Sequence, residues 1–207
     1  RKKADLIIGN NVYAHVPDIN DFTLGLKHLL SRDGSITLEF PHVLNLIEHN
    51  QFDTIYHEHF SYLSLGTVCK IFERANLRIY DVEKLSTHGG SLRVYGCHED
   101  DPREVQDNVT YICAREQNIG INHPEIYSKF QQNIENIKNN FLKFLIEQKE
   151  LGKTTMVYGA AAKGNTLLNF AGVKSDLISA VCDAAEAKQG NYLPGSHLPI
   201  LTPEAIN

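Results

Sequence analysis

The sequence predicts an α/β fold, because a strand–helix–strand pattern occurs near each end of the chain. At the amino end, the apolar run at 5–9 is typical of a buried parallel strand. Pro17 and Asp18 then favour the start of a helix that extends to Leu30, and residues 35–40 form a second strand. Two strands joined through a helix in this way are parallel and are connected by a right-handed crossover.

A second pattern of the same kind occurs near the carboxyl end. Residues 154–158 are predicted to form a strand, the small-residue run Gly159–Asn165 a tight loop and Thr166–Ala171 a helix, followed by a strand at 177–182. This order is that of the first half of a nucleotide-binding βαβ module. The sequence therefore predicts a Rossmann-like part at this end.

Shorter elements are expected between these two parts. A short helix is predicted at 43–49, and Ser64 introduces another helix. Strands follow at 77–84 and 91–97, and residues 103–150 form a helical region of low glycine and proline content.

Composition excludes several function classes. A content of 42% hydrophobic and 22% charged residues is that of an ordinary globular protein, and a formal net charge of −5 gives no basic surface for nucleic acid. No apolar run approaches the ~20 residues of a membrane-spanning helix, so we expect no membrane partner. The four cysteines show no CxxC or CxxH spacing, which predicts no metal site and free thiols in a reducing cytoplasm.

The segment Tyr56–Tyr62 (YHEHFSY) concentrates groups that are suited to proton transfer. Its seven residues carry two imidazoles, a carboxylate, two phenols and a hydroxyl. A packed core avoids such a density of ionisable groups because each of them needs a partner. Acid–base catalysis, in contrast, uses groups that titrate near neutrality and are held between aromatic walls. The segment is therefore either an acid–base site or the polar start of a helix.

The run Gly159–Asn165 (GAAAKGN) is a candidate anion site. Small residues between a strand and a helix let backbone N–H groups approach a ligand, and the helix N-terminus favours an anion such as phosphate. Lys163 adds a positive charge, but the motif lacks the patterns GxGxxG and GxxxxGK[ST]. The alternative is a tight turn that needs small residues for packing alone. Asp183, ~20 residues after the loop, lies where such folds place a ribose-binding acid, although it is equally a common turn former.

Further polar residues lie at predicted strand ends. Asn11 and His15 follow the first strand, at the edge where parallel sheets bind ligands. Their alternatives are a turn former and an incidental surface residue. In the turn THGGS, His88 and Ser91 either face a substrate or simply flank a Gly-Gly bend.

Five motifs together closely resemble the S-adenosylmethionine-dependent C-methyltransferases that act on nucleotide-linked keto-deoxysugars, such as C-3′-methyltransferases. The motifs are NNVYAHVPD (Asn10–Asp18), YHEHFSYLS (Tyr56–Ser64), STHGGSLRVY (Ser86–Tyr95), GAAAKGN (Gly159–Asn165) and KQGNYLPGSHLPI (Lys188–Ile200). They follow the order of the family and span nearly the whole chain.

The resemblance implies an enzyme with a zinc-binding N-terminal domain, a central S-adenosylmethionine-binding Rossmann domain and a C-terminal Rossmann-like domain for the nucleotide-sugar. The chain lacks the zinc segment and the main cofactor-binding loop, and its only methionine is Met156. We therefore expect a remnant of a class I methyltransferase Rossmann sheet (1–55), a catalytic-motif segment with a helical region (56–150), and an incomplete nucleotide-sugar-binding part (151–207). This piece alone is not expected to methylate any acceptor.

The implied chemistry is removal of a proton next to a ketone, followed by attack of the enolate carbon on the cofactor methyl group. His59 is the expected base, Glu58 orients an imidazole or raises its basicity, Tyr56 is a hydrogen-bonding partner, and His15 binds the keto oxygen or enolate. Asn11 is expected near the cofactor. The residues expected to bind substrate are Gly159, Ala160, Ala161, Ala162, Lys163, Gly164, Asn165, Asp183, His88 and Tyr192.

Two other functions are compatible with these residues. One is a methyltransferase of the same architecture that acts on a different small acceptor. The other is a non-catalytic nucleotide-binding module, in which GAAAKGN binds a ligand and YHEHFSY is structural. An NAD-dependent oxidoreductase is disfavoured because the dinucleotide fingerprint is missing.

Overall fold

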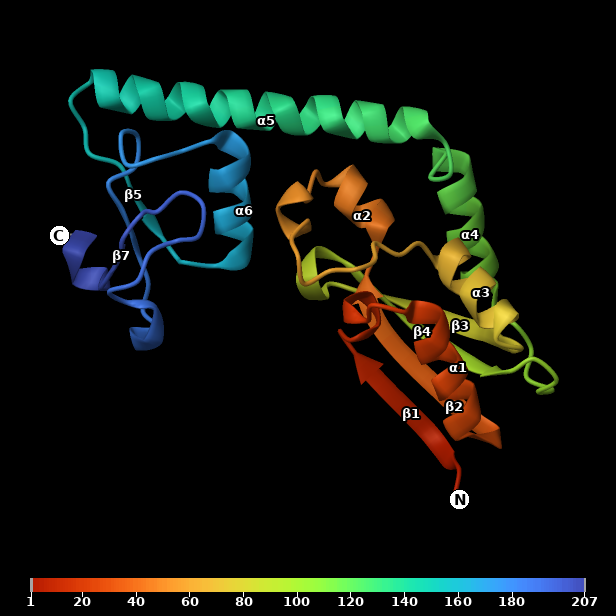
Figure 1. Cartoon of the computed structure of the whole chain (residues 1–207). Coiled ribbons are helices and arrows are strands. Elements are labelled where there is room, and N and C mark those ends of the chain that lie inside the picture. The colour runs from red at the N-terminus through yellow and green to blue at the C-terminus, as the bar shows by residue number, and fades with distance from the viewer. Residues whose placement is uncertain (1, 207) are drawn as a thin grey trace. The chain divides into compact units, whose positions relative to one another are not determined.

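The structure, a computed structural model, describes residues 2–206. The chain divides into two compact units (Figure 1). The first contains the residues up to Gln51 together with His57–Ser128, and the second contains Phe52–Tyr56 together with the residues from Lys129 onward. The three-part division expected from the resemblance follows different boundaries and stays a prediction.

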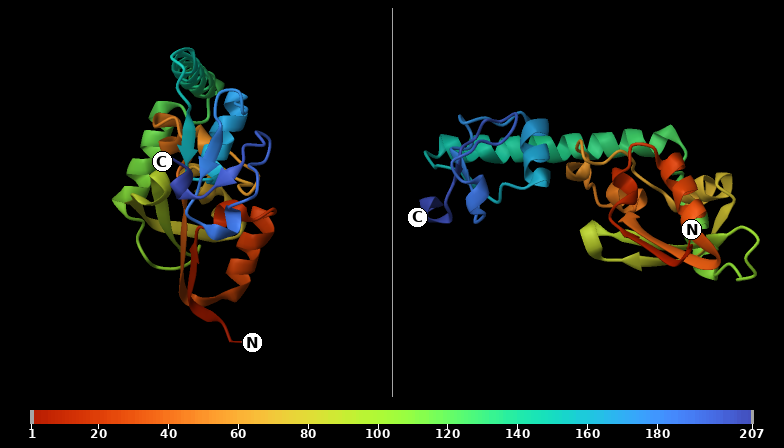
Figure 2. Two further views of the ribbon diagram at one scale, coloured as in Figure 1. Left: turned by 90° about the vertical axis from the view of Figure 1, so that its left-hand side faces the viewer. Right: turned by 60° about the horizontal axis from the view of Figure 1, so that its bottom comes forward.

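The first unit is a four-stranded mixed sheet in the order β1-β2-β4-β3 (Figures 1 and 2). The pair β1–β2 is parallel, and the other two pairs are antiparallel. The strands are β1 (Ala4–Asn10), β2 (Leu30–Pro41), β3 (Leu77–Leu85) and β4 (Ser91–His98). The helices are α1 (Ile19–Leu29), α2 (Val43–Glu48), α3 (Leu65–Arg74) and α4 (Asp107–Ile119).

Side-chain caps explain where two helices of this unit begin. The carboxylate of Asp18 accepts hydrogen bonds from the backbone N–H groups of Asn20 and Asp21 at the start of α1. The Ser64 hydroxyl accepts from the N–H of Thr67 at 3.1 Å at the start of α3. Such caps satisfy N–H groups that the first helical turn leaves without a partner. Both helices therefore start where the sequence predicts.

The two faces of this sheet differ in character. One face packs under the helices in an apolar core, to which β2 contributes the fully buried residues Ile36, Leu38 and Phe40. Because side chains alternate along a strand, the intervening residues point to the other face. On that face, one row of paired residues crosses all four strands. In strand order it consists of Asn10, Glu39, Arg93 and Glu83.

The second unit is built on a three-stranded parallel sheet in the order β5-β6-β7. Its strands are short: β5 (Met156–Tyr158), β6 (Ala180–Cys182) and β7 (Ile200–Leu201). Helix α6 (Ala162–Ala171) joins β5 to β6, and most of the long helix α5 (Pro124–Glu150) belongs to this unit. The apolar core includes Leu145, Leu168, Ile178, Val181 and Leu198.

The predicted α/β fold class is confirmed, and both predicted strand–helix–strand patterns form parallel pairs. Several boundaries differ from the prediction, including those of β2, α6 and β6. Strand β2 begins already at Leu30, because that residue pairs with Ala4 of β1. Helix α6 begins at Ala162 rather than at Thr166, and strand β6 begins only at Ala180. Within residues 2–206, no helix has both the length and the apolar character needed to cross a membrane.

Candidate functional site

The carboxyl end of β1 carries two of the predicted site residues. Asn11 follows the strand with a φ of 58°, and its N–H donates to the carbonyl oxygen of Glu39 at 2.9 Å. The chain then makes a 3-10 turn, Tyr13–His15, which is anchored by a 2.7 Å hydrogen bond between the hydroxyls of Tyr13 and Thr23. Burial raises the pKa of Tyr13 to about 12, so this phenol stays neutral. The buried turn fixes the point from which His15 projects.

The YHEHFSY segment lies against this turn. The N–H of Phe60 donates to the carbonyl oxygen of Ala14 at 2.9 Å. The Nδ1 atom of His15 lies 2.9 Å from the carbonyl oxygen of Glu58, and the His15 and His59 ring centroids are 4.7 Å apart. The structure therefore brings together two histidines that the sequence places in different motifs.

The contact with Glu58 defines which nitrogen of His15 carries the proton. A carbonyl oxygen only accepts hydrogen bonds, so Nδ1 of His15 is the donor. The other nitrogen, Nε2, is then an acceptor in the neutral imidazole and a donor in the imidazolium. His59 is half-buried and also has Tyr62 beside it, at 6.0 Å between ring centroids. Two imidazoles and a phenol in this arrangement form a group that can exchange protons.

Other residues of the cluster are placed differently. Tyr56 belongs to the second unit, where its N–H donates to the carbonyl oxygen of Thr54 at 3.2 Å. Glu58 is exposed and binds His15 through its carbonyl oxygen, so the roles predicted for the Tyr56 and Glu58 side chains stay predictions. The segment itself is irregular and α3 begins only at Leu65, so a polar helix start is the wrong interpretation.

A second pair of predicted residues meets at the same strand end. The Nδ2 atom of Asn11 lies 2.7 Å from Nε2 of His88. Like Asn11, His88 has a left-handed backbone, with a φ of 52°, in the turn between β3 and β4. Among the described residues, the buried Oδ1 atom of Asn11 has no hydrogen-bond partner. The sequence prediction gave these two residues to different ligands, whereas the structure joins them to each other.

Sequence reasoning missed Glu39. This residue is only 7% exposed, and its carboxylate accepts hydrogen bonds from the Thr87 hydroxyl at 2.8 Å and from Nη2 of Arg93 at 3.0 Å. The hydrogen bond with Glu39 raises the pKa of Arg93. A carboxylate between the buried residues Leu38 and Phe40 of β2 is the signal that points to it, because a buried charge needs a charged partner.

In the second unit, Asp183 holds the turn that follows β5. Gly159 has a φ of 102°, which glycine adopts readily. The carboxylate of Asp183 accepts from the N–H of Ala185 at 2.8 Å, from Nζ of Lys188 at 2.9 Å and from the N–H of Ala160 at 2.7 Å. These bonds lower the pKa of Asp183 to about 2. Both of its oxygens are thus engaged within the protein, and its contact with a ribose stays a prediction.

The GAAAKGN run is part turn and part helix. Helix α6 begins after Ala161, which supplies no side-chain cap. The N–H of Asn165 donates to the carbonyl oxygen of Ala161 at 3.0 Å, so the preceding N–H groups lie at the open end of the helix, where its dipole favours an anion. Lys163, in the first turn, is exposed, and so is Tyr192.

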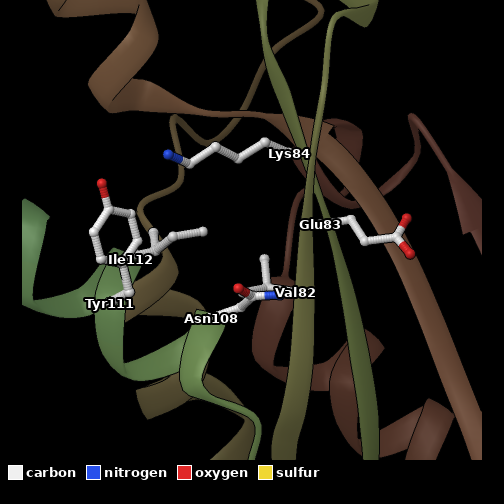
Figure 3. A pocket seen from close by; sticks show the side chains of 6 residues that line it. All are labelled: Val82, Glu83, Lys84, Asn108, Tyr111 and Ile112. Atoms are coloured by element: carbon white, nitrogen blue, oxygen red, sulfur yellow. The ribbon is translucent and has the colours of Figure 1, made fainter.

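A pocket of about 410 Å³ lies elsewhere in the first unit, between β3 and α4 (Figure 3). It is lined by Val82, Glu83, Lys84, Asn108, Tyr111 and Ile112. The Lys84 ammonium lies 5.2 Å from the centroid of the Tyr111 ring, whereas the Glu83 side chain points to the other side of the strand (Figure 3). Within residues 2–206, no group of three or more His, Cys, Asp or Glu side chains is arranged to hold a metal ion.

Two comparisons with known proteins define the class of protein. A family model and a curated relative that match this chain are both C-methyltransferases. The family model described as C-methyltransferase C-terminal domain matches residues 86–207. The C-methyltransferase NovU of Streptomyces niveus is 38% identical over 201 residues, which cover 97% of this chain and 48% of NovU. The chain belongs to the C-methyltransferase family, as its motifs predict, and residues 86–207 correspond to the C-terminal domain. It spans about half the length of this curated relative.

Two solved structures are distantly similar to this chain. Magnesium protoporphyrin IX methyltransferase from Synechocystis PCC 6803, with bound SAH, has a TM-score of 0.37 and 17% identity, and the match covers 47% of this chain and 46% of that one. LepI in complex with SAM has a TM-score of 0.39 and 10% identity, with 47% of this chain and 27% of that one covered. TM-scores of this size do not establish a shared fold.

Proposed function

We propose that the protein to which this chain belongs transfers a methyl group from S-adenosylmethionine to a carbon atom of a nucleotide-linked keto-deoxysugar. Membership of the C-methyltransferase family supports the methyl transfer to carbon. The observation that carries the proposal is the contact between His15 and His59 at the carboxyl end of β1, because carbon methylation needs a base beside the cofactor.

The reaction proceeds through an enolate. A base removes the proton from the carbon next to the ketone, and the electron pair of the C–H bond moves towards the keto oxygen. The enolate carbon then attacks the methyl group of the sulfonium. A C–C bond forms as the S–CH₃ bond breaks, and S-adenosylhomocysteine leaves with the sulfur electron pair.

We assign the two imidazoles complementary roles in this reaction. His59 accepts the proton. His15, whose Nδ1 donates to the carbonyl oxygen of Glu58, offers Nε2–H to the enolate oxygen in its imidazolium form. Asn11 is the cofactor contact.

The second unit supports a role in binding the nucleotide. The open helix end at Ala161–Lys163 and the Lys163 charge suit a diphosphate, and the exposed ring of Tyr192 is available to cover the base or ribose. Asp183 keeps the turn before this helix in shape through its bond with Ala160. We place the reaction in the cytoplasm, because the described cysteines are all free thiols.

The test is deuterium wash-out in the full-length protein. A keto-sugar nucleotide deuterated at the acidic carbon is incubated with S-adenosylhomocysteine, so that enolate formation is measured without methyl transfer. We expect His59→Asn to slow the wash-out by roughly 10²–10⁴-fold while the affinity for S-adenosylhomocysteine is unchanged. The matched control is His57→Asn, which alters the neighbouring exposed histidine and leaves the rate near wild type.

Four results would contradict parts of the proposal. Undiminished wash-out in His59→Asn removes His59 as the base, and loss of wash-out only in His15→Asn exchanges the two roles. Turnover of a different small acceptor, with none of any keto-sugar nucleotide, identifies another C-methyltransferase. Nucleotide binding that survives His59→Asn, with no wild-type turnover of any acceptor, identifies a non-catalytic binding module.

A further inference from the structure

The contact between Asn11 and His88 joins two residues whose backbones are both in the left-handed region. Residues other than glycine adopt this backbone region at a cost in free energy, and they keep it only where the surrounding structure imposes it. The two residues lie far apart in the sequence and follow different strands. Another part of the first unit must therefore hold the backbones of Asn11 and His88 in this conformation.

Glu39 contacts both sides of this pair. Its carbonyl oxygen accepts from the N–H of Asn11 at 2.9 Å, which fixes the backbone just after β1. Its carboxylate oxygen Oε1 accepts from the hydroxyl of Thr87 at 2.8 Å, and Thr87 directly precedes His88. One residue of β2 thus ties down the strand end that carries Asn11 and the turn that carries His88.

The carboxylate of Glu39 is itself held in place. Arg93 of β4 donates to Oε2 at 3.0 Å, and on its other side Arg93 lies 3.8 Å from the carboxylate of Glu83. Because one carboxylate oxygen serves Thr87 and the other serves Arg93, the role of Glu39 lies within the protein rather than in contact with a ligand. A carboxylate that accepts a hydrogen bond on each oxygen holds β4 and the turn that contains His88 at a fixed separation.

The rest of the turn leaves little freedom. The Gln51 amide donates to the carbonyl oxygen of Gly89 at 2.8 Å, and the Ser91 hydroxyl donates to the carbonyl oxygen of Thr87 at 3.1 Å. A Cβ atom at Gly90, where φ is 116°, would lie 2.3 Å from Nδ2 of Asn45. The turn is therefore fixed by hydrogen bonds and by close packing.

We propose that Glu39 is a positioning residue that acts through Thr87 to hold the His88 imidazole against Asn11. The inference rests on the proposed function, in which Asn11 contacts the cofactor. With Nδ2 of Asn11 donating to Nε2 of His88, the imidazole is neutral and carries its proton on Nδ1.

The first test needs no turnover and uses this chain. Long-range ¹H–¹⁵N spectra in mildly alkaline buffer report which nitrogen of each imidazole carries the proton, and the signal missing in His88→Gln identifies His88. We expect a single Nδ1–H tautomer in the wild type and a tautomer mixture in Thr87→Val and in Glu39→Ala. Thr87→Ser keeps the hydroxyl and restores the wild-type signal. Glu73→Ala, the matched control, removes an exposed carboxylate of α3 and leaves the signal unchanged.

Kinetics in the full-length protein complete the test. We expect Thr87→Val to lower kcat/KM for the keto-sugar nucleotide by roughly 10- to 100-fold, and Thr87→Ser to recover most of it. A wild-type tautomer that persists in both Thr87→Val and Glu39→Ala, or a mixture already in the wild type, would overturn the positioning role. If no keto-sugar nucleotide is turned over by the wild type, the proposed function fails, while the spectra still decide the role of Glu39.

Discussion

Glu116 of α4 holds three elements of the first unit together through one carboxylate. It is 2% exposed and accepts hydrogen bonds from Nε2 of His42 at 2.7 Å and from the N–H groups of Leu65 and Gly66 at 2.7 and 2.9 Å. The last two groups belong to the first turn of α3, which has no partner for them within the helix. We predict that this carboxylate is among the most sensitive positions of the unit.

The cost of replacing it follows from these three bonds. In Glu116→Gln, one side-chain oxygen still accepts, but an NH₂ group now faces a buried donor. Since a buried hydrogen bond to a charged group contributes about 1.5–3 kcal/mol, we expect a loss of about 2–3 kcal/mol in the free energy of unfolding. Glu116→Ala leaves His42 and two backbone N–H groups without an acceptor, which raises the expected loss to about 3–5 kcal/mol.

The matched control is Glu48→Gln, which breaks a partly exposed ion pair with Arg115, 2.7 Å apart, and should cost about 0–1 kcal/mol. Urea unfolding is followed through amide NMR signals of the first unit, because a chain of two units need not unfold in one step. Faster hydrogen exchange at Leu65 and Gly66 in Glu116→Gln would locate the damage at the start of α3. A loss no larger in Glu116→Gln than in Glu48→Gln would refute the reasoning.

Two further predictions concern the second unit. Lys163→Ala should weaken the binding of thymidine diphosphate by roughly 3- to 10-fold, because it removes an exposed cation at the helix end. Lys153→Ala, which removes another exposed lysine, should leave the affinity unchanged. Equal calorimetric affinities for Lys163→Ala and the wild type would contradict the placement of the nucleotide. The pKa of Asp183, lowered in the folded state to about 2, implies that its stabilising contribution is present above the unfolded pKa and is lost as the pH falls from about 4 towards 2. Faster amide exchange of Ala160 over that pH range, and no such transition in Asp183→Asn, is the expected result.

The elements that the sequence predicts correctly depend on local signals. Caps such as Asp18 and Ser64 act within a few residues of themselves, and an apolar run flanked by turn residues identifies a strand without knowledge of its partners. The beginning of α6 is predicted too late because Gly164 and Asn165 are poor helix formers in isolation. Packing of Leu168 into the core outweighs that local preference.

Pairings across the sheet could not be predicted in the same way. His15 and His59 are each identified from their motifs, but their contact depends on how the irregular segment folds back on the turn after β1. Glu39 and Arg93 become partners only through the register of β2 and β4, which many separate contacts determine together. Residues that position other residues therefore cannot be predicted from single motifs.

Because β4 lies inside the sheet, between β2 and β3, its position limits where related proteins can exchange segments by recombination. The family's C-terminal domain, counted as a stretch of sequence, starts at Ser86, one residue after β3 ends. Its first strand, however, lies between β2 and β3, both of which precede that boundary. A recombination event at Ser86 would pair β4 from one ancestor with two strands from another, and Arg93 with a foreign Glu39. The start of the family domain and the end of the first folded unit thus lie at different places in this chain. We expect chimeras joined near Ser128, where the first unit ends, to keep the four-stranded sheet intact.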